Sequence, residues 1–271
     1  MLAIDSSFLD FKQLDLLALR QTAIHRLDPR AKVLTTLCFI VCVVSFDKYQ
    51  VSAMLPFLIY PVALVAVGNL PLGYILRKIM IVIPFALLIG LFNPIFDRQV
   101  IMQLGTMDLS GGWLSCFSIL IRAILTASAA IILVATTGFP AICEALGKLR
   151  MPQVFVVQLL FLYRYIFVLT DEGVRIARAR QLRSFGRRGL GIRQFGSLAG
   201  HLLLRTWERA ERIHMAMLAR GFSGEVHSTR RQIHFGSKDL LFTCCWIAIF
   251  ILLRIHNAPQ LLGNLIMGSM P

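Results

Sequence analysis

Charged side chains are scarce in this 271-residue chain. Asp, Glu, Lys and Arg make up 15% of it, whereas 57% of the residues are hydrophobic and the mean hydropathy is +0.72. A typical soluble domain is about 25% charged. This deficit excludes an ordinary soluble domain and places the sequence among multi-pass membrane proteins.

Acidic residues are fewer still. There are 14 of them against 28 Lys and Arg, which gives a net charge of +14. In a soluble protein such an excess would indicate a nucleic-acid partner. In a membrane protein it is typical of cytoplasmic loops, which collect Lys and Arg. We therefore expect membrane lipid, and no nucleic acid, beside this chain.

Motifs that hold metals or disulfides are missing. None of the six cysteines forms a CxxC or a zinc spacing, and all lie in or beside apolar runs, as small buried hydrophobes do. His227 and His234 are seven residues apart without a Cys or carboxylate pattern around them. The sequence predicts no metal site.

A phosphate-binding loop is also missing. Gly147-Lys148 is followed by Leu149, so no GxxxxGK[ST] motif is present, and no nucleophile–base pair stands out. We expect a chain that is not an enzyme and holds no cofactor of its own.

Long apolar runs predict an all-α fold with about five to six membrane helices. Asp28 is suited to cap the first helix and Pro29 to begin it. Asp97 to Gly112 is expected as an outer loop, and Arg122 is an isolated charge within a span. The expected spans are 29–46, 49–76, 79–96, 113–138 and 240–253.

Charge predicts the orientation. Fourteen bases and five acids lie between residues 171 and 238, and residues 26–32 are also cationic, so we expect both regions in the cytoplasm. By parity, the apolar segment 153–170 is a slanted or partly embedded segment, with a true span as the rival. The predicted regions are an N-terminal membrane bundle at 1–140, a cytoplasmic helical region at 141–236 and a C-terminal membrane helix at 237–271.

The cytoplasmic region contains two polar helices. Asp171 pairs in spacing with Arg175, and Glu208 with Arg212. Each helix has an arginine near its C-terminal end and a glycine soon after, so a guanidinium can project past the tip toward a carboxylate pocket. Arginines that merely face water or lipid headgroups remain the alternative. The second helix has an apolar stripe of Leu203, Thr206, Ala210, Ile213 and Met217.

These residues resemble a known family. The run His25 to Lys32 before the first membrane helix resembles the N-terminal signature of the T component of energy-coupling factor (ECF) transporters. Two further stretches resemble its coupling motifs, and the resemblance spans residues 24 to about 224. The first comprises Arg164, Asp171-Glu172, Arg175-Ile176 and Leu182-Arg183-Ser184, and the second comprises Ala210, Ile213, Ala216-Met217 and Ala219-Arg220-Gly221-Phe222.

The resemblance implies that Arg183 and Arg220 dock into two ABC-type ATPase subunits, which bind the ATP. It adds Leu182, Ser184, Ala219 and Gly221 as docking neighbours, and Arg175, Arg180, Ala210, Ile213 and Met217 as supporting residues of the coupling helices. The first motif reads Leu-Arg-Ser where the second reads Ala-Arg-Gly, so its neighbours depart from the small residues of the pattern. The chain would link the ATPases to a substrate-capture membrane subunit, with a small accessory membrane subunit, in the bacterial inner membrane.

Within the family, length and layout are most similar to the cobalt permeases associated with cobalamin synthesis. Nickel, biotin and other vitamin relatives stay open, since nothing in the sequence identifies the substrate. Two functions of another class also remain. One is a basic membrane scaffold or membrane-embedded enzyme that binds anionic lipid. The other is a self-contained channel or carrier.

Overall fold

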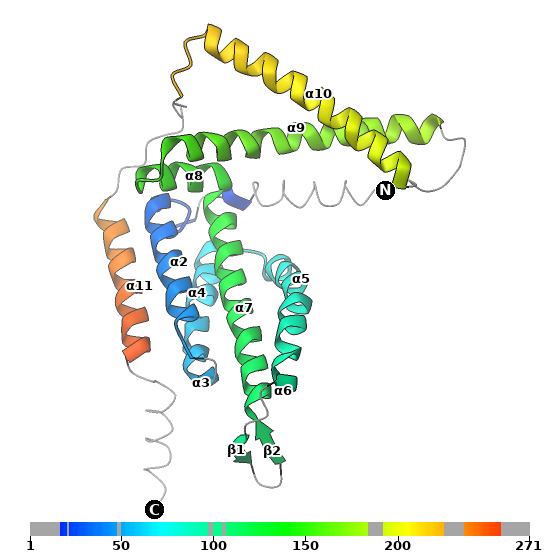
Figure 1. Cartoon of the computed structure of the whole chain (residues 1–271). Helices are drawn as coiled ribbons and strands as arrows, with labels where there is room; N and C mark the ends of the chain where they lie inside the picture. The colour runs from blue at the N-terminus through cyan, green and yellow to red at the C-terminus, as the bar shows by residue number, and fades with distance from the viewer. Residues whose placement is uncertain are drawn as a thin grey trace, which may run out of the picture. The chain divides into compact units, whose positions relative to one another are not determined.

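The structure is a computed structural model, which describes residues 17–20, 22–47, 50–96, 100–104, 107–183, 192–224 and 236–255. These residues are almost wholly helical, which confirms the predicted fold class (Figure 1). They form two compact units. Unit 1 contains residues 1–15 and 139–231, and unit 2 contains residues 16–138 and 232–271. The C-terminal helix therefore groups with the N-terminal bundle.

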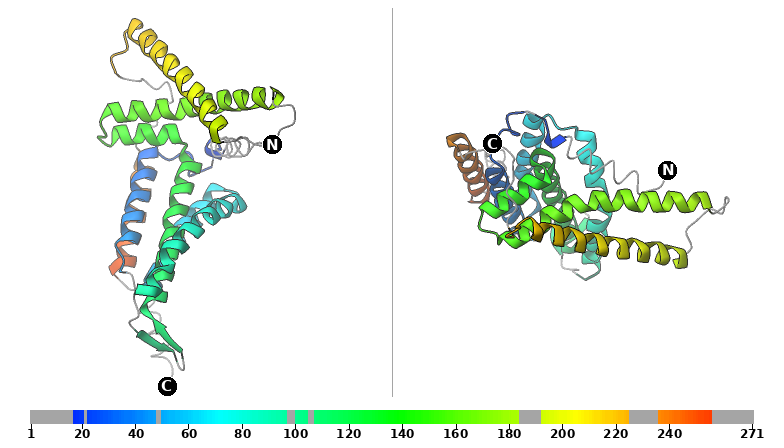
Figure 2. Two further views of the ribbon diagram at one scale, coloured as in Figure 1. Left: turned by 45° about the vertical axis from the view of Figure 1, so that its right-hand side comes forward. Right: turned by 90° about the horizontal axis from the view of Figure 1, so that it is seen from above.

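Unit 2 is a helical bundle with one short hairpin (Figure 2). Strands β1 and β2 pair antiparallel within the segment that we expected to be an outer loop. The elements are α2 (Pro29–Val44), α3 (Val51–Met54), η1 (Leu55–Leu58), α4 (Ile59–Gly68), α5 (Leu72–Leu91), α6 (Asn93–Phe96), β1 (Val100–Leu104), β2 (Met107–Ser110), α7 (Gly111–Thr137) and α11 (Ser237–Ile255).

Four helical stretches of the described residues are long and apolar enough to cross a membrane. They are Val51–Gly68, Leu72–Leu91, Gly111–Thr137 and Gln153–Ala179. Helices α2 and α11, which we also expected to be spans, are 16 and 19 residues long. The chain is a multi-pass membrane protein.

The turn between the second and third spans lies earlier than predicted. We placed it at Arg77-Lys78 because a cationic pair is typical of a membrane boundary. In the structure Asn69 ends α4 with φ of +47°, and Pro71 is the N-cap of α5. Arg77 and Lys78 therefore lie inside α5. Backbone geometry at Asn69 and Pro71, rather than the charges, determines where the chain turns.

Aromatic rings fill the core of unit 2. Phe39 of α2 stacks on Tyr60 of α4, with 4.6 Å between ring centroids, and Phe250 of α11 lies 5.4 Å from Phe39. The hydroxyls of Thr36 and Tyr60 share a 2.9 Å hydrogen bond. Burying these rings brings α11 against α2 although the two helices are about 200 residues apart in the chain.

Buried charges in unit 2 have polar partners. Asp28 caps α2 by accepting from the Arg30 N–H at 2.8 Å, which confirms the predicted cap. Asp239 accepts from the Asp28 N–H at 2.8 Å and from the Gly236 N–H at 2.9 Å, so one carboxylate serves the N-termini of α2 and α11. The Lys32 ammonium donates to the Thr136 carbonyl at 3.1 Å. Such pairing offsets the cost of burying charge.

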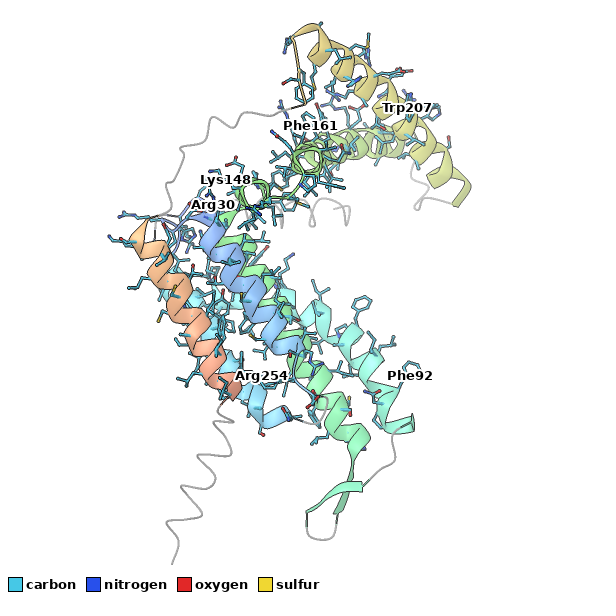
Figure 3. The ribbon with its side chains drawn as sticks, turned by 60° about the vertical axis from the view of Figure 1, so that its left-hand side comes forward. Arg30, Phe92, Lys148, Phe161, Trp207 and Arg254 are labelled. Carbon is cyan, nitrogen blue, oxygen red and sulfur yellow. The ribbon has the colours of Figure 1, made fainter. Side chains whose placement is uncertain are left out.

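Two arginines meet the other end of α2. Arg122 of α7 donates to the Phe46 carbonyl at 2.9 Å, so the charge that had no evident partner in the sequence does have one. Arg254 of α11 donates to the Ser45 carbonyl at 2.8 Å and lies over the Phe46 ring at 4.1 Å (Figure 3). Both guanidiniums satisfy carbonyls that a helix C-terminus leaves unpaired.

Unit 1 contains the long polar helices. Its elements are α8 (Phe139–Lys148), α9 (Gln153–Arg183) and α10 (Ile192–Ala219). Helix α8 lies along the first part of α9, and α10 crosses α9 (Figure 1, Figure 2). Helices α8 and α9 approach closely at Gly147, where an added Cβ would lie 3.2 Å from the Val156 side chain. Phe139 stacks on Tyr163 at 5.0 Å between ring centroids.

Candidate functional site

Helix α9 positions the first candidate arginine. The apolar segment 153–170 and the first polar helix form one continuous helix of 31 residues. Arg183 is its last residue and is exposed, and the Leu182 side chain beside it is 79% exposed. Ser184 and the side chain of Arg180 lie outside the described part of the structure.

Helix α10 positions the second candidate arginine through a left-handed helix end. Gly221 has φ of +78°, its N–H donates to the Leu218 carbonyl at 2.9 Å, and the Phe222 N–H donates to the Met217 carbonyl at 3.0 Å. This is the Schellman pattern, in which glycine is favoured because it has no Cβ. Arg220 is the C-cap residue and is exposed, so the predicted helix end at Gly221 is confirmed.

The segment after this helix end contacts α9 through a pair of aromatic rings. The Phe222 ring lies 6.5 Å from the ring of Phe161, measured between centroids. Phe161, labelled in Figure 3, was not among the residues that the sequence singled out. The contact limits how far the end of α10, and Arg220 with it, can move away from α9.

The helices are also joined where they cross. Arg205 donates to the Glu172 carboxylate at 2.8 Å, and a Cβ on Gly173 would lie 4.0 Å from Leu202. The intrahelical pairs that the spacing predicted, Asp171 with Arg175 and Glu208 with Arg212, do not form ion pairs within 4 Å among the residues described. All four side chains are exposed, and ion pairs between exposed side chains contribute little stability.

The apolar face of α10 differs in part from the predicted stripe. Thr206, Ile213 and Met217 are half-buried as expected, whereas Ala210 is exposed and Leu203 is 67% exposed, with Leu202 turned inward in its place. A second row of large apolar side chains is exposed on α10, and Figure 3 labels Trp207 in it. It consists of Leu203, Leu204, Trp207, Met215 and Leu218. Such a row favours contact with a partner or with membrane.

The surface of the two helices is basic. Arg175, Arg183 and Arg220 are exposed, and the ion pair of Arg205 with Glu172 is the one that the described residues show here. Guanidiniums remain charged at any physiological pH. The described residues contain no group of three His, Cys, Asp or Glu side chains placed to hold a metal ion. The site is therefore suited to binding acidic surfaces.

These features define a multi-pass helical membrane protein with a separate unit of long basic helices. Residues 20–233 match the cobalt transport protein family CbiQ, and the chain belongs to this family. The energy-coupling factor transporter transmembrane protein EcfT of Bacillus subtilis is 25% identical over 252 residues, which are 87% of this chain and 94% of that protein. The resemblance to ECF T components is thereby confirmed.

Two archaeal relatives add to this result. An uncharacterized protein of Methanocaldococcus jannaschii is 27% identical over 245 residues, 86% of this chain and 82% of its own length. A protein named as a fused cobalt transport protein, CbiMQ, from Methanocorpusculum labreanum is 34% identical over 115 residues, 42% of this chain and 19% of its own length. The chain is thus a relative of membrane components of transporters.

Proposed function

We propose that this chain is the coupling subunit of an ECF-type importer. It would transmit ATP-driven motion from two ABC-type ATPase subunits to a substrate-capture membrane subunit. The observation that supports this most directly is the pair of exposed arginines, Arg183 and Arg220, at the C-terminal ends of α9 and α10. A planar, permanently charged fork at a helix tip fits a carboxylate-lined groove.

The two helices are suited to transmitting motion because they are long and joined. Helices of 31 and 28 residues are about 46 and 42 Å long. The Glu172–Arg205 pair joins them at their crossing, and the Phe161–Phe222 contact holds the end of α10. When the ATPase grooves close on ATP, the two tips would be drawn together, and the crossing would carry the displacement along both helices.

The proposed orientation follows from charge. The N-terminus and the basic helices α9 and α10 would face the cytoplasm of a bacterial inner membrane, where a soluble ATPase can reach them. Gln153–Ala179 has the length and composition of a span. If α2 is counted as a span, as the sequence predicts, four crossings precede it, and this even number together with the basic end of α9 favours a position along the membrane surface instead. The exposed apolar row of α10 would then be available to the substrate-capture subunit.

Cobalt is the proposed substrate of the assembled importer. Its support is the description of the matching family and the name of the fused relative. The capture subunit, and not this chain, would bind the ion, and nickel, biotin or other vitamins are the competing substrates. Purification of the native complex, followed by identification of its subunits and bound metal or vitamin, tests this assignment.

Charge reversal tests the docking sites. In the intact complex, Arg183→Glu with Arg220→Glu should reduce ATPase co-purification at least tenfold and abolish uptake, because each glutamate would face an acidic groove. The double variant should still insert in the membrane. Arg209→Glu reverses an exposed arginine in the middle of α10 and should leave both measurements near wild type. Normal ATPase association in the double variant would refute the proposal.

The same experiment separates the other functions. A basic scaffold for anionic lipid would retain lipid and no Walker-motif protein during purification. A self-contained carrier would take up substrate when this chain alone is reconstituted in liposomes. Either result would replace the coupling function.

A further inference from the structure

The short connection between α8 and α9 contains a residue with an unusual backbone conformation. Arg150 has φ of +72°, and the Met151 N–H donates to the Leu146 carbonyl at 3.1 Å. This is the same left-handed helix end that Gly221 forms after α10, with arginine at the position where glycine is favoured. A side chain in this conformation is unfavourable for folding. Such an outlier is a reason to look for a function.

Exposed cations and exposed apolar side chains lie together at this connection. We call residues 148–155 the elbow. Lys148, at the end of α8 in Figure 3, and Arg150 are exposed. Leu149 is 41% exposed, Val154 76% and Phe155 59%. Among the described residues no acid lies within ion-pair distance of either cation. The elbow is thus a cationic surface with an apolar rim.

The elbow is close in sequence to a helix that can span the membrane. Helix α7, which is long enough to span, ends at Thr137, and α8 begins at Phe139. The elbow therefore begins only eleven residues after the end of that span, and ten of those residues form α8. The polar headgroup region adds several ångströms to the hydrocarbon core on each side. A helix that lies along the surface would place the elbow among the headgroups.

We propose that the elbow binds the phosphate groups of anionic phospholipids. Lys148 and Arg150 would contact the phosphates, while Leu149, Val154 and Phe155 enter the boundary with the acyl chains. This combination of cations with adjacent apolar side chains is what surface-bound membrane segments use. An acidic protein groove would match the cations and leave the three apolar side chains facing water. The proposal is independent of ATPase docking.

The left-handed conformation of Arg150 allows a substitution that removes a cation without destabilising the fold. Arg150→Gly removes the cation and relieves the backbone, so the protein should fold at least as well as wild type. Lys148→Gln removes the second cation from an exposed position. Arg178→Gln is the matched control, because Arg178 is an exposed arginine of α9 outside both the elbow and the proposed docking residues.

The experiment is a lipid titration of the full chain in neutral detergent, read by thermal unfolding and by native mass spectrometry. Phosphatidylglycerol should raise the unfolding temperature of wild type and of Arg178→Gln, with bound lipid retained. In Arg150→Gly with Lys148→Gln, the apparent affinity should fall at least fivefold. Phosphatidylcholine and inorganic phosphate should have little effect.

Three results would overturn the proposal. The first is an unchanged phosphatidylglycerol titration in the double variant. The second is equal stabilisation by phosphatidylcholine, which would show that binding does not depend on the net charge of the lipid headgroup. The third is stabilisation by inorganic phosphate alone, which would indicate a free anion site. ATPase co-purification should be unaffected in every variant of this series, so failure here is distinguishable from failure of the docking proposal.

Discussion

The two units use charged side chains in opposite ways. In unit 2, Asp28, Lys32 and Asp239 are buried and hydrogen-bonded. The Asp28 carboxylate caps its own helix, whereas Lys32 and Asp239 bond to the backbone of other helices or their caps. In unit 1, Arg183 and Arg220 are exposed at helix ends. A buried charge that loses its partner lowers the stability of the fold, whereas a solvated arginine can be substituted with little effect on stability. Charge therefore holds unit 2 together and leaves unit 1 ready to bind.

The largest expected difference between the units is at Asp239. Asp239→Ala removes the acceptor of two backbone N–H groups, and hydrogen bonds to charged groups contribute about 1.5–3 kcal/mol each. We expect the free energy of unfolding to fall by about 3 kcal/mol, measured by titration with a denaturing detergent. The matched change in unit 1, Asp171→Ala at an exposed position, should stay within about 0.5 kcal/mol. Equal effects would mean that buried charges are not what stabilises unit 2.

The left-handed helix ends at Arg150 and Gly221, both in unit 1, give the next largest effect. Gly221→Ala places a Cβ at φ of +78°, which costs about 1–2 kcal/mol, whereas Arg150→Gly relieves a similar strain at φ of +72°. The two variants should therefore change stability in opposite directions. Hydrogen exchange should become about fivefold faster at the end of α10 in Gly221→Ala, since 1 kcal/mol corresponds to about that factor. Slower exchange there would contradict the assigned geometry.

A histidine in unit 2 should make stability depend on pH. The ring of His25 accepts from Thr22 at 2.7 Å and donates to the Leu17 carbonyl at 3.1 Å, which suits the neutral form. Burial, with the nearby charge of Lys32 as a smaller cause, lowers the pKa of His25 below 6.5. The unfolded state therefore binds a proton first as the pH falls.

The stability contributed by neutral His25 is present above pH 6.5 and is lost as the pH falls through the lower folded-state pKa. We expect the free energy of unfolding to fall between pH 7.5 and pH 5, because the unfolded state takes up a proton on His25 before the folded state does. His25→Gln should flatten this part of the unfolding curve. A variant with the same slope as wild type would remove His25 as the cause.

The smallest expected effect is at the exposed ion pair of unit 1. The side chain of Arg205 is 65% exposed and that of Glu172 22% exposed. Solvent screening keeps such a pair at about 0.2–1 kcal/mol. Arg205→Gln should thus change thermal stability little, although it removes the link at the α9–α10 crossing. A loss comparable to that of Asp239→Ala would show that unit 1 also depends on its charges.

Local rules account for the parts of the fold that the sequence predicted. Asp28 caps α2 through a backbone N–H two residues away, and Gly221 ends α10 through its own φ angle. The turn at Asn69 was missed because the charged pair Arg77-Lys78 suggested a membrane boundary, whereas the left-handed backbone of a single asparagine cannot be recognised from the sequence. The Arg205–Glu172 pair was missed because its members are 33 residues apart.

The sequence by itself determined that this protein is a helical membrane protein with two basic helices and an arginine at the C-terminal end of each. These features follow from hydropathy and from contacts within about four residues. Only the tertiary structure decided which charges are consumed by the fold. Arg122 and Arg254 serve the end of α2, and Asp239 serves its start from 211 residues away. The reason is physical: pairing of a buried charge depends on which helices the packed core brings together.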